Sequence, residues 1–319
     1  MTTRSNLNPF LGMGDTLIYS AYYAPRGRNR LYMLAAKLAQ RYLYPNDLLI
    51  GVIGSEGAGK STLIQGLFPG LELTNDDHGL NVKPTPLYQF DPDDYFSGHT
   101  FHLDARYELA FHQKYEITKA INLAVLHGRR VVVEHFDLIY DALGYNAQVL
   151  FGIGEEVVVA RPTVFGPFPQ GIKKVVDSTI RFRRMAHSAE DITGYFVERD
   201  FDIGQKIRHS DIKHGFVIQF PDKVTINIET LEQQVKEVIA EDLPIEPDGD
   251  DHICFGEVRF ECTGVRTHVS STGKIEGFRL LKELKFDPIN RAYLLVGMVG
   301  HREIAGFEEM SDTMEREDE

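Results

Sequence analysis

The eight residues 54–61 constrain the fold of this chain more than any other segment. They read GSEGAGKS and match the pattern GxxxxGK[ST] at every fixed position. The apolar run 47–53 before them predicts a buried strand, and residues 61–68 after them have helical periodicity ended by Pro69-Gly70. A strand, a glycine-rich turn and a helix form the setting that this pattern requires. The alternative, a glycine-rich turn that contains Lys-Ser by chance, explains neither the strand nor the helix.

The residue types in this segment are suited to bind phosphate. Its glycines let backbone N–H groups turn inward around an anion, and the helix that follows adds the positive end of its dipole. Lys60 is expected to reach the β- and γ-phosphates of a nucleotide, and Ser61 to ligate the Mg²⁺ that bridges them, with Thr62 as the alternative hydroxyl. The predicted nucleotide site comprises Gly54, Ser55, Glu56, Gly57, Ala58, Gly59, Lys60, Ser61 and Thr62. ATP and Mg²⁺ are the expected cofactors, because the guanine-reading pattern Asn-Lys-x-Asp is not found in the sequence.

Composition excludes several classes of protein. With 319 residues and 43% hydrophobic content, the chain can bury a large core and is expected to hold more than one domain. Its formal charge of −13 argues against a protein that coats nucleic acid with its whole surface. We find no apolar run of the roughly 20 residues that cross a bilayer, and no signal peptide at the start. A cytoplasmic protein without a membrane partner is expected, and its two cysteines fit a reducing compartment.

Predicted strands alternate with predicted helices over most of the chain, which indicates an α/β fold with a mostly parallel sheet flanked by helices. Residues 1–244 are expected to form the nucleotide-binding domain, with an N-terminal arm and helix over 1–46. A boundary is expected in the acidic, Pro- and Gly-containing stretch 242–251. A small β-rich α+β domain would follow over 245–305, and a disordered acidic tail over 306–319.

Carboxylates that follow predicted strands are candidates for the chemistry of this site. Asp76 and Asp77 follow a predicted strand over 71–74 and would orient an acceptor hydroxyl; the alternative is a pair of solvated turn aspartates. Glu134 ends a strand that is apolar on both faces, so it needs a cation or hydrogen-bond donors. We expect it to help place Mg²⁺, with Asp137 as the runner-up and a structural ion pair as the alternative.

Three arginines, Arg181, Arg183 and Arg184, lie within one turn of a predicted helix. They would suit a lid that closes over a nucleotide, since the arginine fork matches phosphate oxygens. The alternative is an ordinary basic helix face. The predicted catalytic residues are Lys60, Asp76, Asp77, Glu134, Arg181 and Arg184.

The order of these segments resembles the uridine kinase and phosphoribulokinase branch of P-loop kinases. The acidic pair Asp76-Asp77, the run VVVEHFD over 131–137 and the run RFRR over 181–184 occupy the corresponding places. The resemblance covers about half of the chain, and only its phosphate loop is specific. It implies phosphoryl transfer to a small hydroxyl-bearing, nucleoside-like acceptor.

A second segment, 260–283, resembles the second additional domain of alanyl- and threonyl-tRNA synthetases. Thr267-His268-Val269 and the run TGKIEGF over 272–278 carry the resemblance. Together the two parts look like P-loop proteins that carry such a module. The resemblance leaves two alternatives to a kinase open, an ATP-gated module that recognises tRNA or an aminoacyl group, and an ATPase in tRNA modification.

In the editing synthetases, the cysteine and histidine of this segment join an HxxxH pair around zinc. Here Cys262 and His268 would be the corresponding ligands, but five residues separate them where three are expected, and the chain has no HxxxH. A tetrahedral site needs two further ligands, for which His252 and Cys254 are nearest in sequence. The sequence therefore favours a metal-free module with a buried cysteine over a zinc site.

Overall fold

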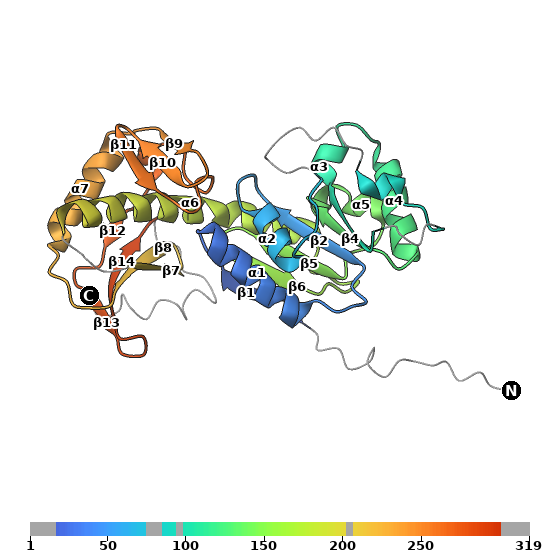
Figure 1. Cartoon of the computed structure of the whole chain (residues 1–319), viewed down its shortest axis with the longest axis horizontal. Helices are drawn as coiled ribbons and strands as arrows, with labels where there is room; N and C mark the ends of the chain where they lie inside the picture. Colours follow the sequence, from blue (N-terminus) through green and yellow to red (C-terminus); the bar gives the residue numbers. More distant parts are fainter. Residues whose placement is uncertain (1–16, 75–84, 94–97, 202–206, 301–319) are drawn as a thin grey trace.

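The computed structural model describes residues 17–74, 85–93, 98–201 and 207–300. The chain forms two lobes joined by one long helix, α6 (Pro169–Asp200) (Figure 1). We call the described residues between 17 and 168 the N-terminal lobe, and residues 207–300 the C-terminal lobe. The predicted acidic pair Asp76-Asp77 and the predicted tail 306–319 lie outside the described residues.

A mixed six-stranded sheet in the order β1-β6-β5-β2-β4-β3 forms the centre of the N-terminal lobe. Its strands are β1 (Ser20–Tyr23), β2 (Leu49–Gly54), β3 (Thr100–Asp104), β4 (Arg130–Glu134), β5 (Val149–Ile153) and β6 (Glu156–Ala160). The four strands β5, β2, β4 and β3 are parallel, and β6 and β1 are antiparallel to their neighbours. After β2, the chain forms β3 and β4 on one side of β2 within the sheet. It then crosses over and forms β5 next to β2 on the opposite side. Ligands of open α/β sheets bind at such a reversal of strand order, beyond the carboxyl ends of the strands.

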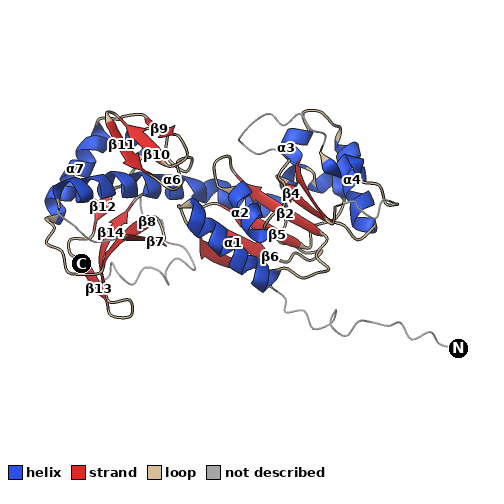
Figure 2. Ribbon diagram, in the orientation of Figure 1, coloured by secondary structure: helices blue, strands red, loops and turns tan. Residues whose placement is uncertain are grey.

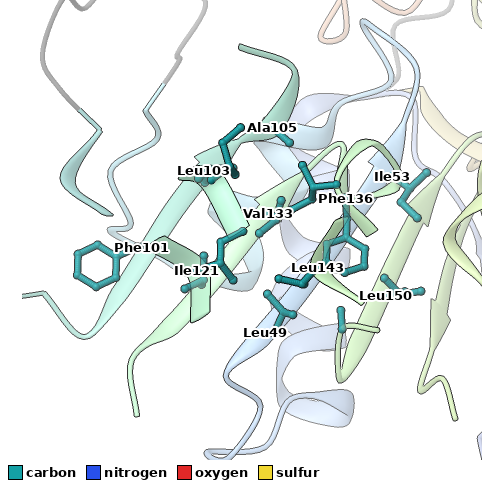
Figure 3. Packing of buried hydrophobic residues seen from close by; sticks show 14 of the residues in the cluster. Leu49, Ile53, Phe101, Leu103, Ala105, Ile121, Val133, Phe136, Leu143 and Leu150 are labelled. Atoms are coloured by element: carbon teal, nitrogen blue, oxygen red, sulfur yellow. The ribbon is translucent and has the colours of Figure 1, made fainter. Parts of the chain in front are cut away.

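Helices cover both faces of this sheet (Figure 2). The elements around it are α1 (Arg28–Tyr42), α2 (Lys60–Leu67), η2 (Pro86–Gln89), α3 (Ala105–Glu108), α4 (Lys114–Leu126), η3 (Phe136–Leu138) and α5 (Tyr140–Leu143). Val132 of β4 packs in the core under α1 and α2, whereas Val131 and Val133 pack in the opposite core, which Figure 3 shows around Phe136. Burial on both faces explains why β4 is continuously apolar. The predicted α/β architecture of this lobe is confirmed.

The strand predicted over residues 71–74 is not formed. The backbone N–H of Thr74 donates to Nδ1 of His102 at 3.1 Å, so that peptide group bonds to a side chain. Leu73 is buried in the core beside α1 and α2. Its apolar character therefore reflects packing of a loop residue, which short apolar runs do not distinguish from a strand.

The C-terminal lobe contains two antiparallel sheets and one further helix. Its elements are β7 (Arg208–Ile212), β8 (Gly215–Phe220), α7 (Ile228–Ala240), β9 (Ile245–Asp248), β10 (His252–Phe255), β11 (Val258–Glu261), η4 (Thr272–Lys274), β12 (Arg279–Leu280), β13 (Lys285–Asp287) and β14 (Ala292–Met298). One sheet has the order β12-β14-β8-β7, with β13 also paired to β14, and the other has the order β11-β10-β9.

The boundary expected between residues 244 and 245 divides this lobe instead of delimiting it. Strand β8 pairs along its length with β14, with Val217 opposite Val296. Side chains of α6, β8 and α7 also share one core with β10 and β14. The acidic stretch 242–251 supplies β9 and the turn before β10, so its polar, turn-forming composition marks a hairpin inside the lobe.

Helix α6 belongs to both lobes. Its first turns pack on the sheet of the N-terminal lobe through Ile172 and Val176, and its later turns contribute Met185 and Ala189 to the core of the C-terminal lobe. Several charged side chains lie buried along its middle. Neither α6 nor any other helix in the part of the chain that the structure describes is long and apolar enough to cross a membrane.

Candidate functional site

A cavity of about 580 Å³ lies at the carboxyl end of β2, between the glycine-rich loop and the C-terminal lobe. Its wall includes the loop and start of α2, the ends of β3 and β4, and the segment 263–267, together with the start of α1, parts of α3 and α6, and Asp250. The residues on which the argument depends are Gly57, Lys60, Ser61, Asp104, Glu134 and Thr267. The cavity therefore lies at the reversal of strand order, where a ligand is expected.

The loop has the backbone geometry that its glycines permit. Gly57 and Gly59 have φ angles of 69° and 92°, and Gly59 directly precedes α2. Lys60, the first residue of α2, folds back so that its ammonium group donates to the carbonyl oxygen of Ser55 at 3.0 Å. Six of the nine predicted loop residues line the cavity: Glu56, Gly57, Gly59, Lys60, Ser61 and Thr62. Gly54, Ser55 and Ala58 complete the loop behind them.

Glu134 lies across from Lys60 at the end of the neighbouring strand. Its Oε1 atom is 3.5 Å from Nζ of Lys60, and its Oε2 atom is 3.6 Å from Nε2 of His102. Burial disfavours ionisation of Glu134, but the effects of His102 and Lys60 outweigh burial and lower its pKa. An ionised carboxylate therefore faces Lys60, in the place predicted for a residue that helps to hold Mg²⁺.

Two further side chains converge with Glu134. Asp104 lies opposite it in the β3–β4 register, and His135 follows it with a φ angle of 56°. Ligand atoms of Asp104, Glu134 and His135 all lie within 4.8 Å of one another, and Ser61 lines the same cavity. Carboxylate and hydroxyl oxygens are suitable ligands for Mg²⁺. Asp137, the predicted alternative to Glu134, lies instead in η3 with its Oδ2 atom 3.4 Å from Nζ of Lys173.

Two of the three predicted arginines, Arg183 and Arg184, contact the loop from α6, and the three do not form a separate lid. Arg183 donates to the carbonyl oxygens of Ala58 at 2.7 Å and of Pro25 at 2.6 Å. Arg184 donates to the carbonyl oxygen of Glu56. Arg181 stacks on the ring of its neighbour Phe182. Arg183 and Arg184 therefore hold the loop backbone through its carbonyl oxygens, and of the three arginines only Arg183 also lines the cavity.

A second cluster lies in the C-terminal lobe and unites Cys262 and His268 with two residues of α6. The Sγ atom of Cys262 is 3.2 Å from Nε2 of His268 and 3.5 Å from Nε2 of His187. The Oδ2 atom of Asp191 is 3.5 Å from His268 Nε2 and 3.9 Å from His187 Nε2. The four ligand atoms lie within 4.8 Å of one another. One thiol, two imidazoles and one carboxylate at this spacing match the ligands and number of a tetrahedral zinc site.

The surroundings of this cluster orient its ligands. Nδ1 of His187 donates to the carbonyl oxygen of Thr267 at 3.1 Å, and Nδ1 of His268 contacts the hydroxyl of Ser188 at 3.1 Å. Both imidazoles therefore direct Nε2 toward Cys262. Such hydrogen bonds on the distal nitrogen are typical of histidine ligands of metals.

Burial gives the cluster protonation states that differ from those of exposed groups. It lowers the pKa of His187 well below its ordinary value and that of His268 to about 3, so both rings are neutral at pH 7. Burial also raises the pKa of Cys262, which the carboxylate of Asp191 raises further, and the pKa of Asp191, which the carboxylate of Glu190 raises further. The Oδ2 atom of Asp191 is buried without a hydrogen-bond partner. A bound cation would supply the missing partner for this oxygen.

The two candidates that lie nearest in sequence, His252 and Cys254, are not the residues that complete this cluster. His252 and Cys254 lie on β10, where His252 pairs with the neighbouring Asp251, and neither joins the cluster. The pattern HxxxH misses His187 and Asp191, which are spaced i and i+4 on one face of α6. A pattern that allows a carboxylate in place of the second histidine would have found them.

The described residues thus form two candidate sites, one with Lys60, Ser61 and Glu134, the other with His187, Asp191, Cys262 and His268. Comparison of the sequence with protein-family models and with curated proteins finds no match.

Proposed function

We propose that the protein is an ATP- and Mg²⁺-dependent phosphotransferase of the P-loop type that acts on a small hydroxyl-bearing, nucleoside-like acceptor. The observation that carries the proposal is the buried pair of Lys60 and Glu134, at 3.5 Å, in a cavity at the reversal of strand order. In this arrangement the lysine can contact the phosphates of a metal–nucleotide complex, and the carboxylate can bind its metal ion. The sequence pattern over residues 54–61 supports the same assignment.

Each side chain has a role that follows from its place. The inward N–H groups of the loop and Lys60 would bind the β- and γ-phosphates. Ser61 and Glu134, with Asp104 beside it, would hold Mg²⁺, which neutralises phosphate charge when bound. In the transfer, the bond between the γ-phosphorus and the β–γ bridging oxygen breaks, and a bond to the acceptor oxygen forms. The acceptor hydroxyl loses its proton, a step for which Asp76 or Asp77 remains the predicted group.

The experiment is to measure ADP production by the purified chain with ATP and Mg²⁺, with and without pooled nucleosides, amino acids and tRNA. Lys60→Ala is the test variant, and Lys37→Ala is its matched control, because Lys37 is exposed on α1 outside the cavity. ADP production that a nucleoside stimulates, and that only Lys60→Ala abolishes, supports the kinase. ADP production that Lys60→Ala leaves unchanged contradicts it.

One contact favours a second candidate, an ATP-gated module that recognises tRNA or an aminoacyl group. The hydroxyl of Thr267, within the synthetase-like segment, donates to the carbonyl oxygen of Gly57 in the loop at 3.4 Å. Nucleotide in the cavity would therefore contact the segment that carries the resemblance. Stimulation of ADP production by tRNA alone, or nucleotide-dependent tRNA binding without turnover, supports this candidate over the kinase.

For the second cluster we propose a zinc ion held by His187, Asp191, Cys262 and His268. Its four protein ligands fill a tetrahedral shell, so the ion would have no open position for a reactive water. That arrangement favours a structural zinc over hydrolytic editing. Zinc content of about one ion per chain in the purified protein, reduced in Cys262→Ser and retained in Cys254→Ser, would support the site; a metal-free protein after purification with zinc present would contradict it.

A further inference from the structure

The two sites share one short segment. Cys262 and His268 belong to the metal cluster, and all five residues between them, 263–267, line the cavity beside the glycine-rich loop. The residues that line the cavity are adjacent in sequence to the two cluster residues, because Thr263 follows Cys262 and Thr267 precedes His268. A change in the position of either ligand must therefore move the cavity wall.

On the side of the cluster, hydrogen bonds hold both ends of the segment to ligand residues. The N–H of Gly264 donates to Sγ of Cys262 at 3.3 Å, and the carbonyl oxygen of Thr267 accepts from Nδ1 of His187 at 3.1 Å. The N–H of Thr267 donates to the carbonyl oxygen of Gly264 at 2.9 Å and closes the turn. A thiolate accepts such an N–H bond more strongly than a thiol, so metal binding at Cys262 strengthens this turn.

On the side of the cavity, the same turn packs against the loop without space to spare. A Cβ atom on Gly57 would lie 2.8 Å from the carbonyl oxygen of Arg266, so the two backbones meet directly. Thr267 donates to Gly57, as described above, and the N–H of Arg28 donates to the carbonyl oxygen of Thr263 at 3.0 Å. Gly264 in turn lies against both the backbone of Arg26 and the ring of His187.

From this arrangement we infer that zinc at the four-residue cluster and nucleotide at the glycine-rich loop bind with positive linkage, through the segment 263–267. Zinc holds the segment in the position that closes the cavity at Gly57. The protein therefore loses less conformational entropy when nucleotide binds. By thermodynamic reciprocity, nucleotide must strengthen zinc binding by the same factor. The inference rests on the proposed nucleotide and zinc sites.

The test uses the full chain, Zn²⁺ alone and a non-hydrolysable ATP analogue. We expect the dissociation constant of the analogue to rise about fivefold or more when zinc is removed, and to return when zinc is restored. We also expect the analogue to slow zinc release to a chromogenic chelator, a measurement that needs no metal-free protein. Equal nucleotide affinity with and without zinc, together with an unchanged rate of zinc release, would overturn the inference.

Thr267→Val separates linkage from general stability. Valine keeps the size of threonine and leaves all four ligands in place, but it removes the hydroxyl that donates to Gly57. The variant should retain one zinc ion per chain and lose most of the effect of nucleotide on zinc release. Cys254→Ser is the matched control, because Cys254 lies outside the cluster and the cavity.

The result also distinguishes this inference from the proposed function. If Lys60→Ala abolishes binding of the analogue while zinc has no effect on the wild type, only the linkage fails. If the wild type binds no nucleotide with or without zinc, the proposed function fails and the linkage with it.

Discussion

Lys60 and Glu134 form the pair on which the proposed phosphoryl transfer depends. Both side chains are buried, and the ammonium group also donates to the carbonyl oxygen of Ser55. The lowered pKa of Glu134 means that the carboxylate is charged although it is shielded from water. A buried charge of this kind needs a cation or hydrogen-bond donors beside it, and His102 and Lys60 supply them.

Glu134→Gln keeps the shape of this side chain and removes its charge. We expect the proposed Mg²⁺-dependent ATP turnover to fall about 100-fold or more, because the proposed Mg²⁺ site loses an anionic ligand, while nucleotide binding without metal changes little. Steady-state phosphate release and a binding titration measure the two effects. Glu72→Gln, an exposed glutamate on the same lobe, is the control and should retain full turnover.

Gly57 is a position where a single added carbon atom is expected to lower the stability of the fold. Its φ angle is 69°, and an added Cβ would lie 2.8 Å from the carbonyl oxygen of Arg266. We expect Gly57→Ala to lower the free energy of unfolding by about 1–3 kcal/mol through backbone strain and this contact. Gly70→Ala is the matched control, because Gly70 has a φ angle of 85° and a Cβ atom added there would have no neighbour within 4 Å. Denaturant titrations that show equal losses in both variants would contradict a role for the contact with Arg266.

At the scale of elements, two turns join the lobes beside α6. Glu155 lies in the turn between β5 and β6, and Lys213 and His214 lie in the turn between β7 and β8. The Oε1 atom of Glu155 accepts from the N–H of His214 at 2.6 Å, and its Oε2 atom is 3.3 Å from Nζ of Lys213. Burial, reinforced by Glu156, nevertheless outweighs these partners and raises the pKa of Glu155 to about 7.

The raised pKa predicts a pH dependence of stability. In the unfolded chain Glu155 ionises near its ordinary pKa of 4.5, whereas in the folded chain it keeps its proton up to about pH 7. The contribution of this group is therefore fully present below pH 4.5 and is lost as the pH rises to 7, by about 3 kcal/mol. Glu155→Gln should remove that loss in denaturant titrations at pH 4.5 and 7.5. The exposed control Glu257→Gln should follow the wild type, and a Glu155→Gln profile identical to both would refute the assignment.

At the scale of the whole molecule, Arg26 connects the N-terminal lobe to α6 and the C-terminal lobe. Its Nε donates to Glu190 of α6 at 2.7 Å, and its other nitrogens donate to the carbonyl oxygens of Gly215 and Ser210 at 3.0 Å. Burial opposes ionisation of Glu190, but Arg26 and His209 outweigh it and lower the pKa to about 2. The ion pair therefore stabilises the fold above pH 4.5 and loses this contribution as the pH falls toward 2.

Removal of one partner leaves the other charge buried with only its remaining contact, His209 for Glu190 and Asp211 for Arg26. We expect Arg26→Met to lower the free energy of unfolding by about 3–5 kcal/mol, and the double variant Arg26→Met/Glu190→Met to lose less than the sum of the two single variants. Chemical denaturation monitored by circular dichroism measures these losses. The control is Arg41→Met, which changes an exposed arginine of α1 and should alter the free energy of unfolding by no more than about 0.5 kcal/mol. An equally small effect of Arg26→Met would show that the Arg26–Glu190 pair does not stabilise the fold.

The lobe boundary illustrates why local patterns could not predict the C-terminal half. The sequence indicated a β-rich region after residue 245, but not that its strand β14 pairs with β8, which comes before that residue. That pairing joins segments separated by α7 and five strands, and no turn signal between them records it. Local composition instead pointed to the acidic stretch 242–251, which is a hairpin inside the lobe.

The sequence by itself determined the strand, glycine-rich loop and helix around Lys60, because the residues that set this geometry are consecutive and their φ angles and spacing are local properties. It also determined the burial of β4 and the place of Glu134 at its end. Only the tertiary structure decided what faces the loop: Arg183 behind it, and Thr267 against Gly57. Only the tertiary structure assembled the cluster proposed to bind zinc, since Cys262 and His187 lie 75 positions apart and their meeting depends on how α6 packs in the C-terminal lobe.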